Sequence, residues 1–148
     1  MLLTNLPQKR KRLGMKARSI SCYVIACLYL AAGVMHLVLP APFVAIVPPW
    51  VPAPALMVML TGLAEIFGAI GIAQRRFASL RKAAACGLAL YAACVWPANF
   101  QHMAIDLAKP DRDYMLAYHI PRLMLQPVLI WWPLWAAGLI QWPLRSTR

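Results

Sequence analysis

The sequence predicts an all-α integral membrane protein, a four-helix bundle with a proline-rich interfacial loop between helices 1 and 2. Three observations lead to this class: 62% of the 148 residues are hydrophobic, only 13% are charged, and the mean hydropathy is +0.63. A chain of this length leaves much of its surface exposed, so a soluble fold could not hide so much apolar area from water. The same composition excludes intrinsic disorder, which requires few apolar residues.

The formal net charge of the chain is +11. Its basic residues lie at the ends and in short connections, and they form no stripe interleaved with aromatic side chains, as a nucleic-acid-binding groove requires. We therefore expect the lipid bilayer, and no nucleic acid, to be the partner of this charge.

Four apolar stretches are long enough to cross a bilayer, which takes about 20 helical residues. They cover residues 20–39, 55–73, 83–104 and 120–141, and Glu65 and Arg122 are the charged residues inside them. Helix is the expected form because unpaired backbone amides are costly in hydrocarbon. The period-two alternation of barrel strands is missing.

The positions of Lys and Arg predict the orientation. Six lie in the N-terminal tail, four between spans two and three, and two in the C-terminal tail, whereas the other two connections share two. Basic residues are retained in the cytoplasm, so we expect both termini there, in a bacterial inner membrane. The predicted organisation is a basic tail at residues 1–18, a membrane domain at 19–142 and a tail at 143–148. The first span continues past its small residues, so an uncleaved helix is favoured over a signal peptide.

The connection between the first two spans, residues 40–54, reads PAPFVAIVPPWVPAP and holds six of the 13 prolines. Proline lacks an amide donor, so we expect no helix here. The stretch is too apolar for a free aqueous loop. We interpret it as an interfacial lid over the outer end of the bundle, with Phe43 and Trp50 at headgroup depth.

Each predicted span carries polar residues in the half that this orientation places outside. They are His36, Glu65, Asn99, His102, Arg122 and Gln126. Asn99 and His102 are three residues apart and Arg122 and Gln126 are four apart, so each pair shares a helix face. We predict that these six side chains converge on a ligand-binding pocket, with no catalytic residue assigned. The alternative is a structural polar knot that ties the helices together.

Small residues flank Glu65 on its helix, which allows another helix to come close. A carboxylate facing lipid would be costly, so Glu65 is expected to face the interior. Its expected partner is Arg122, a histidine or a bound group.

A quinone is a possible ligand of this pocket, since its two carbonyl oxygens need donors and its tail needs an opening to lipid. His36 and His102 could instead ligate a b-type haem, and His36, Glu65 and His102 could form a metal site; we favour both less and assign no metal ligands. The four cysteines form no C-x-x-C pair and lie within the apolar spans, so we expect free, inert thiols.

Four strings carry a family resemblance: GVMHLVLPAPFVAIVPPWVP, TGLAEIFGAIGI, VWPANFQHM and RLMLQPVLIWW. On these strings, over roughly residues 20–140, the chain resembles the DoxX-like family of small four-helix bacterial membrane proteins. His36 matches the family's outer histidine, Glu65 its acid, Asn99 its P-A-N string, and Arg122 and Gln126 its R-x-x-x-Q string.

The resemblance implies a four-helix fold and a place beside redox systems, such as a thiosulfate:quinone oxidoreductase or thiol-homeostasis complexes. It implies no general catalytic mechanism, so enzymatic activity is left open. We therefore expect an accessory or quinone-interacting component of a membrane redox system, as a complex subunit or a homo-oligomer. The alternatives are a non-catalytic assembly or chaperone-like protein and, less favoured, a small-solute permease.

Overall fold

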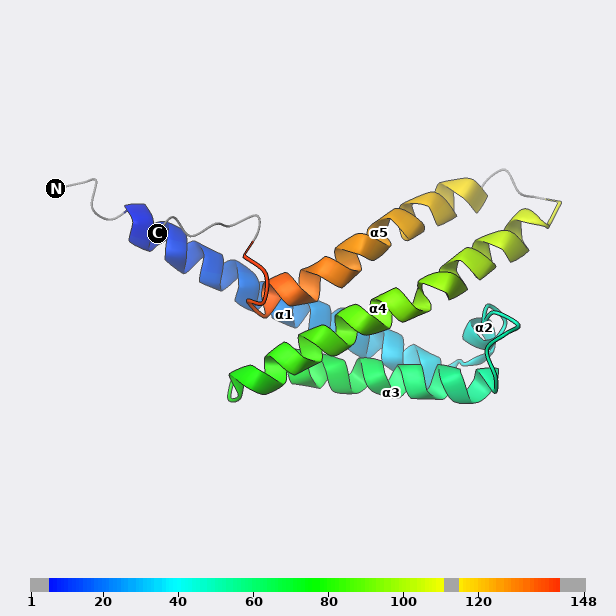
Figure 1. Ribbon diagram of the computed structural model, residues 1–148, viewed down its shortest axis with the longest axis horizontal. Coiled ribbons are helices and arrows are strands. Elements are labelled where there is room, and N and C mark those ends of the chain that lie inside the picture. The colour runs from blue at the N-terminus through cyan, green and yellow to red at the C-terminus, as the bar shows by residue number, and fades with distance from the viewer. Residues whose placement is uncertain (1–5, 111–114, 142–148) are drawn as a thin grey trace.

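The computed structural model describes residues 6–110 and 115–141, which form helices joined by turns and contain no strand. In chain order the helices are α1 (Leu6–Val38), α2 (Ala41–Val44), α3 (Pro54–Ala73), α4 (Ala78–Leu107) and α5 (Met115–Ala136) (Figure 1). The predicted all-α class is therefore confirmed.

Among the described residues, three helical segments are long and apolar enough to cross a membrane: Arg12–Val38, Pro54–Ala73 and Ala78–Leu107. α5 is not one of them, although it has 22 residues. Its three internal prolines lower its hydropathy, as do Arg122, Gln126 and its tryptophans. The fourth predicted span thus coincides with a helix of sufficient length but lower hydropathy.

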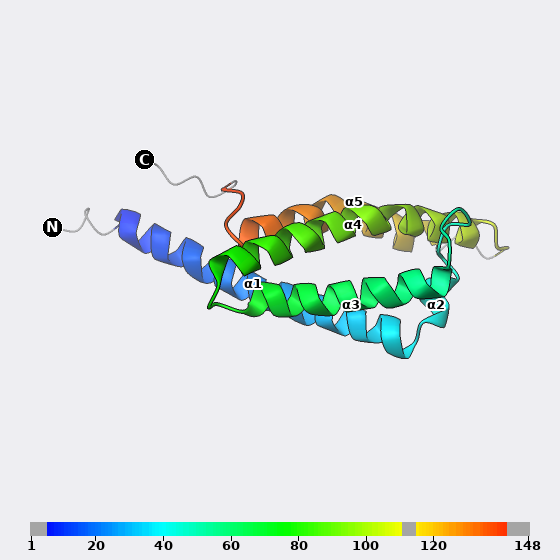
Figure 2. The same ribbon diagram turned by 60° about the horizontal axis from the view of Figure 1, so that its bottom comes forward.

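The four long helices are arranged as two pairs. α1 packs along α3, and α4 packs along α5, while contacts of α3 with α4 and of α1 with α5 join the pairs. Figure 2 shows the pairs as two layers, with α1 and α3 in one and α4 and α5 in the other. Residues from all four helices can therefore face a common interior.

The apolar core lies toward the α3–α4 connection. Its most buried large side chains are Ile25, Ile72 and Leu88, which are at most 1% exposed, and small residues such as Ala69 and Ala85 fill the space between helices. Most of the predicted polar residues lie farther toward the opposite end of the bundle. Apolar packing thus occupies one half of the interior and polar contacts the other.

α1 and α3 approach closely because both carry glycine at their contact. A Cβ added to Gly33 would lie 2.6 Å from the carbonyl oxygen of Gly62, and one added to Gly62 would lie 2.8 Å from the Cβ of His36. Both distances are too short for any side chain without a shift of the helix backbone. This contact brings His36 and Glu65 to the same level.

The end of α5 differs from the prediction, which extended the fourth span to residue 141. Gly138 has a φ of +81°, and the amides of Gly138 and Leu139 donate to the carbonyls of Trp135 and Leu134. This is a Schellman motif, which ends a helix at a glycine that can adopt a left-handed conformation. Arg18 of α1 donates to the Ile140 carbonyl at 3.1 Å and fixes the turn against α1.

Two helical segments were not predicted from the sequence. α1 begins at Leu6, inside the predicted tail, because lysine and arginine are good helix formers. The loop at residues 40–54 contains the short helix α2, since Pro42 lies in its first turn, where no amide donor is needed. The predicted C-terminal tail, residues 143–148, lies outside the residues that the structure describes.

The glycine contact predicts a stability difference between matched variants. Gly62→Ala should lower the free energy of unfolding by about 1–3 kcal/mol, because the new methyl group overpacks the α1–α3 contact. A Cβ on Gly87 of α4 meets nothing within 4 Å, so Gly87→Ala should be neutral or slightly stabilising. SDS titration of protein in mild detergent measures both, and equal stabilities of the two variants would contradict the contact.

Candidate functional site

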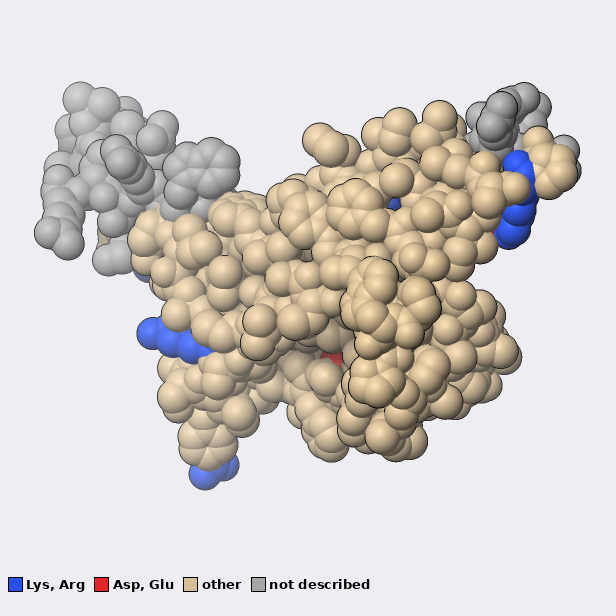
Figure 3. Space-filling model, turned by 45° about the vertical axis from the view of Figure 1, so that its right-hand side comes forward, with Lys and Arg blue, Asp and Glu red and all other residues tan. Residues whose placement is uncertain are grey.

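A cavity of about 590 Å³ lies between the two helix pairs. Its walls are mainly apolar, and charged or amide side chains reach it from three helices: Glu65 of α3, Asn99 of α4, and Arg122 and Gln126 of α5. In Figure 3 the visible surface is almost entirely uncharged, and the acidic atoms in view lie inside a hollow. An apolar pocket with a few converging polar groups is the usual form of a small-molecule site.

Glu65 lies on the α1–α3 side of the cavity and is 3% exposed. Its Oε2 is 2.9 Å from Nδ1 of His36, which is also 2.8 Å from the carbonyl oxygen of Ala32. The imidazole proton can serve one of these acceptors at a time, and the Tyr91 hydroxyl is a further hydrogen-bond partner of the Glu65 carboxylate. Because each carboxylate oxygen has two lone pairs, Glu65 borders the cavity with an oxygen that can accept a further hydrogen bond.

His36 is covered by the loop that the sequence predicted as a lid. The ring of Phe43, from α2, stacks on the imidazole with centroids 3.9 Å apart and planes at 26°. Trp50 of the same loop is 71% exposed. Phe43 therefore shields the His36–Glu65 pair from the loop side, whereas Trp50 faces the surroundings of the protein.

Asn99 and Gln126 connect α4 to α5. The Asn99 side-chain amide donates to Oε1 of Gln126 at 3.2 Å, and the Gln126 amide donates to the backbone carbonyl of Ala92. Pro97 lacks the amide that would bond the carbonyl of Ala93, so α4 is loosened in the turn that Gln126 reaches. These two buried amides join the helices at the cavity wall.

Arg122 contacts the cavity and also a second polar group of side chains. Its Nη1 donates to Nδ1 of His102 at 2.6 Å, since a guanidinium can only donate. Nε2 of His102 lies 3.2 Å from Oδ2 of Asp106. The same oxygen is 3.0 Å from Nε2 of His119, and Lys109 donates to Oδ1 at 2.6 Å.

The six predicted residues are thus placed in two ways. Glu65, Asn99, Arg122 and Gln126 line the cavity directly, whereas His36 and His102 lie behind Glu65 and Arg122. Glu65 pairs with His36, one of its expected partners, and Arg122 with His102. The structure does not gather His36, Glu65 and His102 into one metal-ligand set, because Glu65 turns toward α1 and His102 toward α5.

Sequence reasoning missed two groups of residues. Tyr29, Tyr91 and Tyr118 line the cavity, and nothing in their spacing marked them. Asp106 and His119 lie outside the predicted spans 83–104 and 120–141, but α4 continues to Leu107 and His119 is fully buried. The four-residue spacing of His102 and Asp106 was the available signal for this group.

The cysteines are free thiols, as expected. Cys22 is buried, with its thiol 3.6 Å from the carbonyl oxygen of Ala136, whereas Cys27, Cys86 and Cys94 are exposed on the helix surface. None of them lines the cavity.

The fold and the cavity define a helical protein with apolar helices of membrane length around an amphipathic pocket. The chain belongs to the family described as a domain of unknown function (DUF8561), which matches residues 25–137. The matched region contains every residue that lines the cavity. No curated protein and no solved structure matches the chain.

The pairing of Glu65 with His36 predicts an energetic coupling between them. His36→Leu leaves a buried carboxylate without its partner and should destabilise the fold by about 3–5 kcal/mol. In the Glu65→Gln background the same change should cost much less, because an amide carries no charge. A double-mutant cycle by SDS titration should give a coupling above about 1 kcal/mol.

The control cycle combines Glu65→Gln with Arg122→Gln, since Arg122 donates to His102 instead. We expect the coupling between Glu65 and Arg122 to be smaller than the coupling between Glu65 and His36. A larger coupling of Glu65 to Arg122 than to His36 would contradict the pairing in the structure.

Proposed function

We propose that this is a multi-pass protein of the bacterial inner membrane in which all four long helices span the bilayer. α5 has 22 residues, and at 1.5 Å per residue its length of about 33 Å matches a hydrocarbon core of about 30 Å. It packs against α4 and α1, which both contain segments of membrane-spanning character. Its prolines and polar side chains are tolerated in a span where they face the protein interior.

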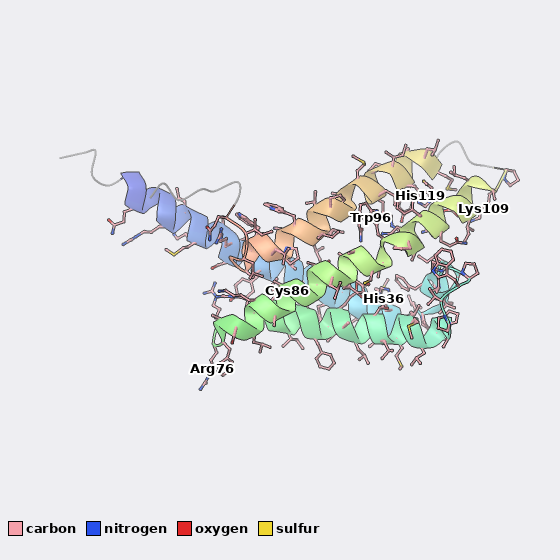
Figure 4. All side chains as sticks on the ribbon, in the orientation of Figure 1. His36, Arg76, Cys86, Trp96, Lys109 and His119 are labelled. Carbon is pink, nitrogen blue, oxygen red and sulfur yellow. The ribbon has the colours of Figure 1, made fainter. Side chains whose placement is uncertain are left out.

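The distribution of charge supports cytoplasmic termini. Arg12, Lys16 and Arg18 of α1 and the four basic residues around the α3–α4 connection lie toward one end of the bundle, and Lys109 lies at the other. Figure 4 labels Arg76 and Lys109 at these opposite ends. Basic residues collect on the cytoplasmic side, so the α3–α4 connection would face the cytoplasm and the α2 loop the outside.

This orientation predicts the labelling of single cysteines introduced with the exposed native cysteines replaced by serine. Ala45→Cys, in the α2 loop, should react with a membrane-impermeant maleimide in intact cells. Ala78→Cys, at the start of α4, should react only after the cells are permeabilised. The reverse pattern would invert the orientation.

For the cavity, the function best supported is binding of an amphipathic redox ligand of the quinone type, with the protein as an accessory component of a membrane redox system. The observation that carries it is that a few polar groups converge on a cavity with mainly apolar walls, Glu65 from α3 and Asn99, Arg122 and Gln126 from α4 and α5. Glu65 Oε2 can accept a hydrogen bond from a quinol hydroxyl, and the guanidinium of Arg122 has donors beyond the one used by His102. Leu125 and Leu129 offer an apolar surface for a tail. The resemblance to DoxX-like proteins favours the same ligand class.

Co-purification tests this function. Protein extracted in mild detergent should carry quinone, and Asn99→Ala and Arg122→Gln should reduce the amount several-fold, because each removes a polar group that lines the cavity. Thr61→Ala is the matched control: Thr61 donates within α3 to the Val58 carbonyl and does not line the cavity. Equal quinone in wild type and both cavity variants would exclude the cavity as its site.

A non-catalytic assembly or chaperone-like role is the second candidate. The observation that favours it is that Asn99 and Gln126 bond each other and the backbone, as a structural tie between helices would. This role predicts a co-purifying protein and a cavity without quinone.

A further inference from the structure

A second group of polar side chains lies at the end of α4 and α5 that carries Lys109, behind Arg122 and outside the lining of the cavity. It consists of His102, Asp106 and His119, named here the two-histidine cluster. One ligand atom from each residue lies within 4.8 Å of the other two. Figure 4 labels His119 of α5 close to the α4 end that bears Lys109. We propose that the two-histidine cluster binds a divalent transition-metal ion of the zinc class.

The donor set fits such an ion. Two imidazoles and one carboxylate, with a position left for water, are the protein ligands of many zinc sites and of non-haem iron sites. Ligand atoms about 2.0–2.2 Å from a tetrahedral ion lie about 3.3 Å from one another. Two of the three separations are already close to this value, since Oδ2 of Asp106 is 3.2 Å from Nε2 of His102 and 3.0 Å from Nε2 of His119. The ligand atoms of the two imidazoles lie within 4.8 Å of each other and must close to the same separation when an ion binds.

The helices hold these ligands in place. His102 and Asp106 are four residues apart on one face of α4, and His119 approaches the same oxygen from α5. His119 is fully buried, and its Nδ1 has no hydrogen-bond partner among the described residues. Its one polar contact is therefore made by Nε2, the atom that would ligate the ion. The side chain of His102 is 26% exposed, which leaves an entry from outside the bundle.

Two cations oppose the ion: Lys109, which donates to Oδ1 of Asp106, and Arg122, which donates to His102. Lys109 leaves Oδ2, the ligating oxygen, free, so Arg122 is the direct competitor at a ligand. Its donation to Nδ1 of His102 keeps the ring proton on Nε2, the ligating nitrogen. When Nε2 binds a metal, that proton moves to Nδ1, and Arg122 must leave this nitrogen. Arg122 also lines the cavity, so metal binding would turn its donor toward whatever occupies the cavity. The metal site itself does not depend on the identity of that ligand.

The test uses tag-free full-length protein in which Cys27, Cys86 and Cys94 are replaced by serine. This protein is titrated with Co²⁺, and the bound Co²⁺ is then displaced with Zn²⁺. We expect one saturable visible cobalt spectrum per chain without a thiolate charge-transfer band, and a thermal midpoint raised by Zn²⁺. Asp106→Asn and His119→Gln should weaken binding at least about tenfold. His119→Gln retains a donor toward Asp106, so its fold is expected to persist.

Arg122→Gln should increase the affinity for metal, a result that misfolding of the variant could not produce. It removes a positive charge and offers an amide oxygen to the Nδ1 proton of metal-bound His102, so Co²⁺ should bind about tenfold more tightly. No saturable cobalt spectrum in the parent protein, or the same spectrum and affinity in His119→Gln, would overturn the metal site. An unchanged Co²⁺ affinity in Arg122→Gln would contradict the competition between Arg122 and the metal ion for His102. Neither result depends on whether quinone co-purifies.

Discussion

The burial of Glu65 is the constraint on which the rest of the polar interior depends. A carboxylate between apolar helices requires a partner, and His36 can supply one only because Gly33 and Gly62 let α1 and α3 approach closely. With this pair fixed, α4 and α5 close the other side of the cavity through Asn99 and Gln126. The cavity thus lies between two separately tied helix pairs.

The two halves of the interior are held together by different kinds of contact. Toward the α3–α4 connection, Ile25, Ile72 and Leu88 pack with small residues and hold the four helices together mainly by apolar contacts. In the other half the helices are joined by polar contacts around the cavity, and Arg122 connects the cavity to the two-histidine cluster. A change in the cavity or in the two-histidine cluster is therefore expected to alter the other, because both contact the guanidinium of Arg122.

The sequence allowed the helical class and the approximate helices to be predicted because apolar stretches of membrane length are a strong signal. The boundaries that failed depended on local backbone chemistry: Gly138 ends α5 early, and Pro42 fits the first turn of α2. For the candidate site, helical spacing and burial cost predicted which polar residues face inward. They did not predict which pairs form, because pairing depends on helix rotation: Glu65 meets His36, and Arg122 meets His102. His119 was missed because its burial depends on the packing of α5 against α4.

The most direct test of the central claim, that the cavity is a binding site for an amphipathic redox ligand, is photolabelling in native membranes. An azido-quinone analogue would be cross-linked and the modified residues mapped by mass spectrometry. The account predicts that labels concentrate on cavity-lining positions such as Val95 and Leu129 and are displaced by excess unmodified quinone. Labelling confined to outward-facing positions such as Leu90, which is 66% exposed, and insensitive to competitor would contradict it.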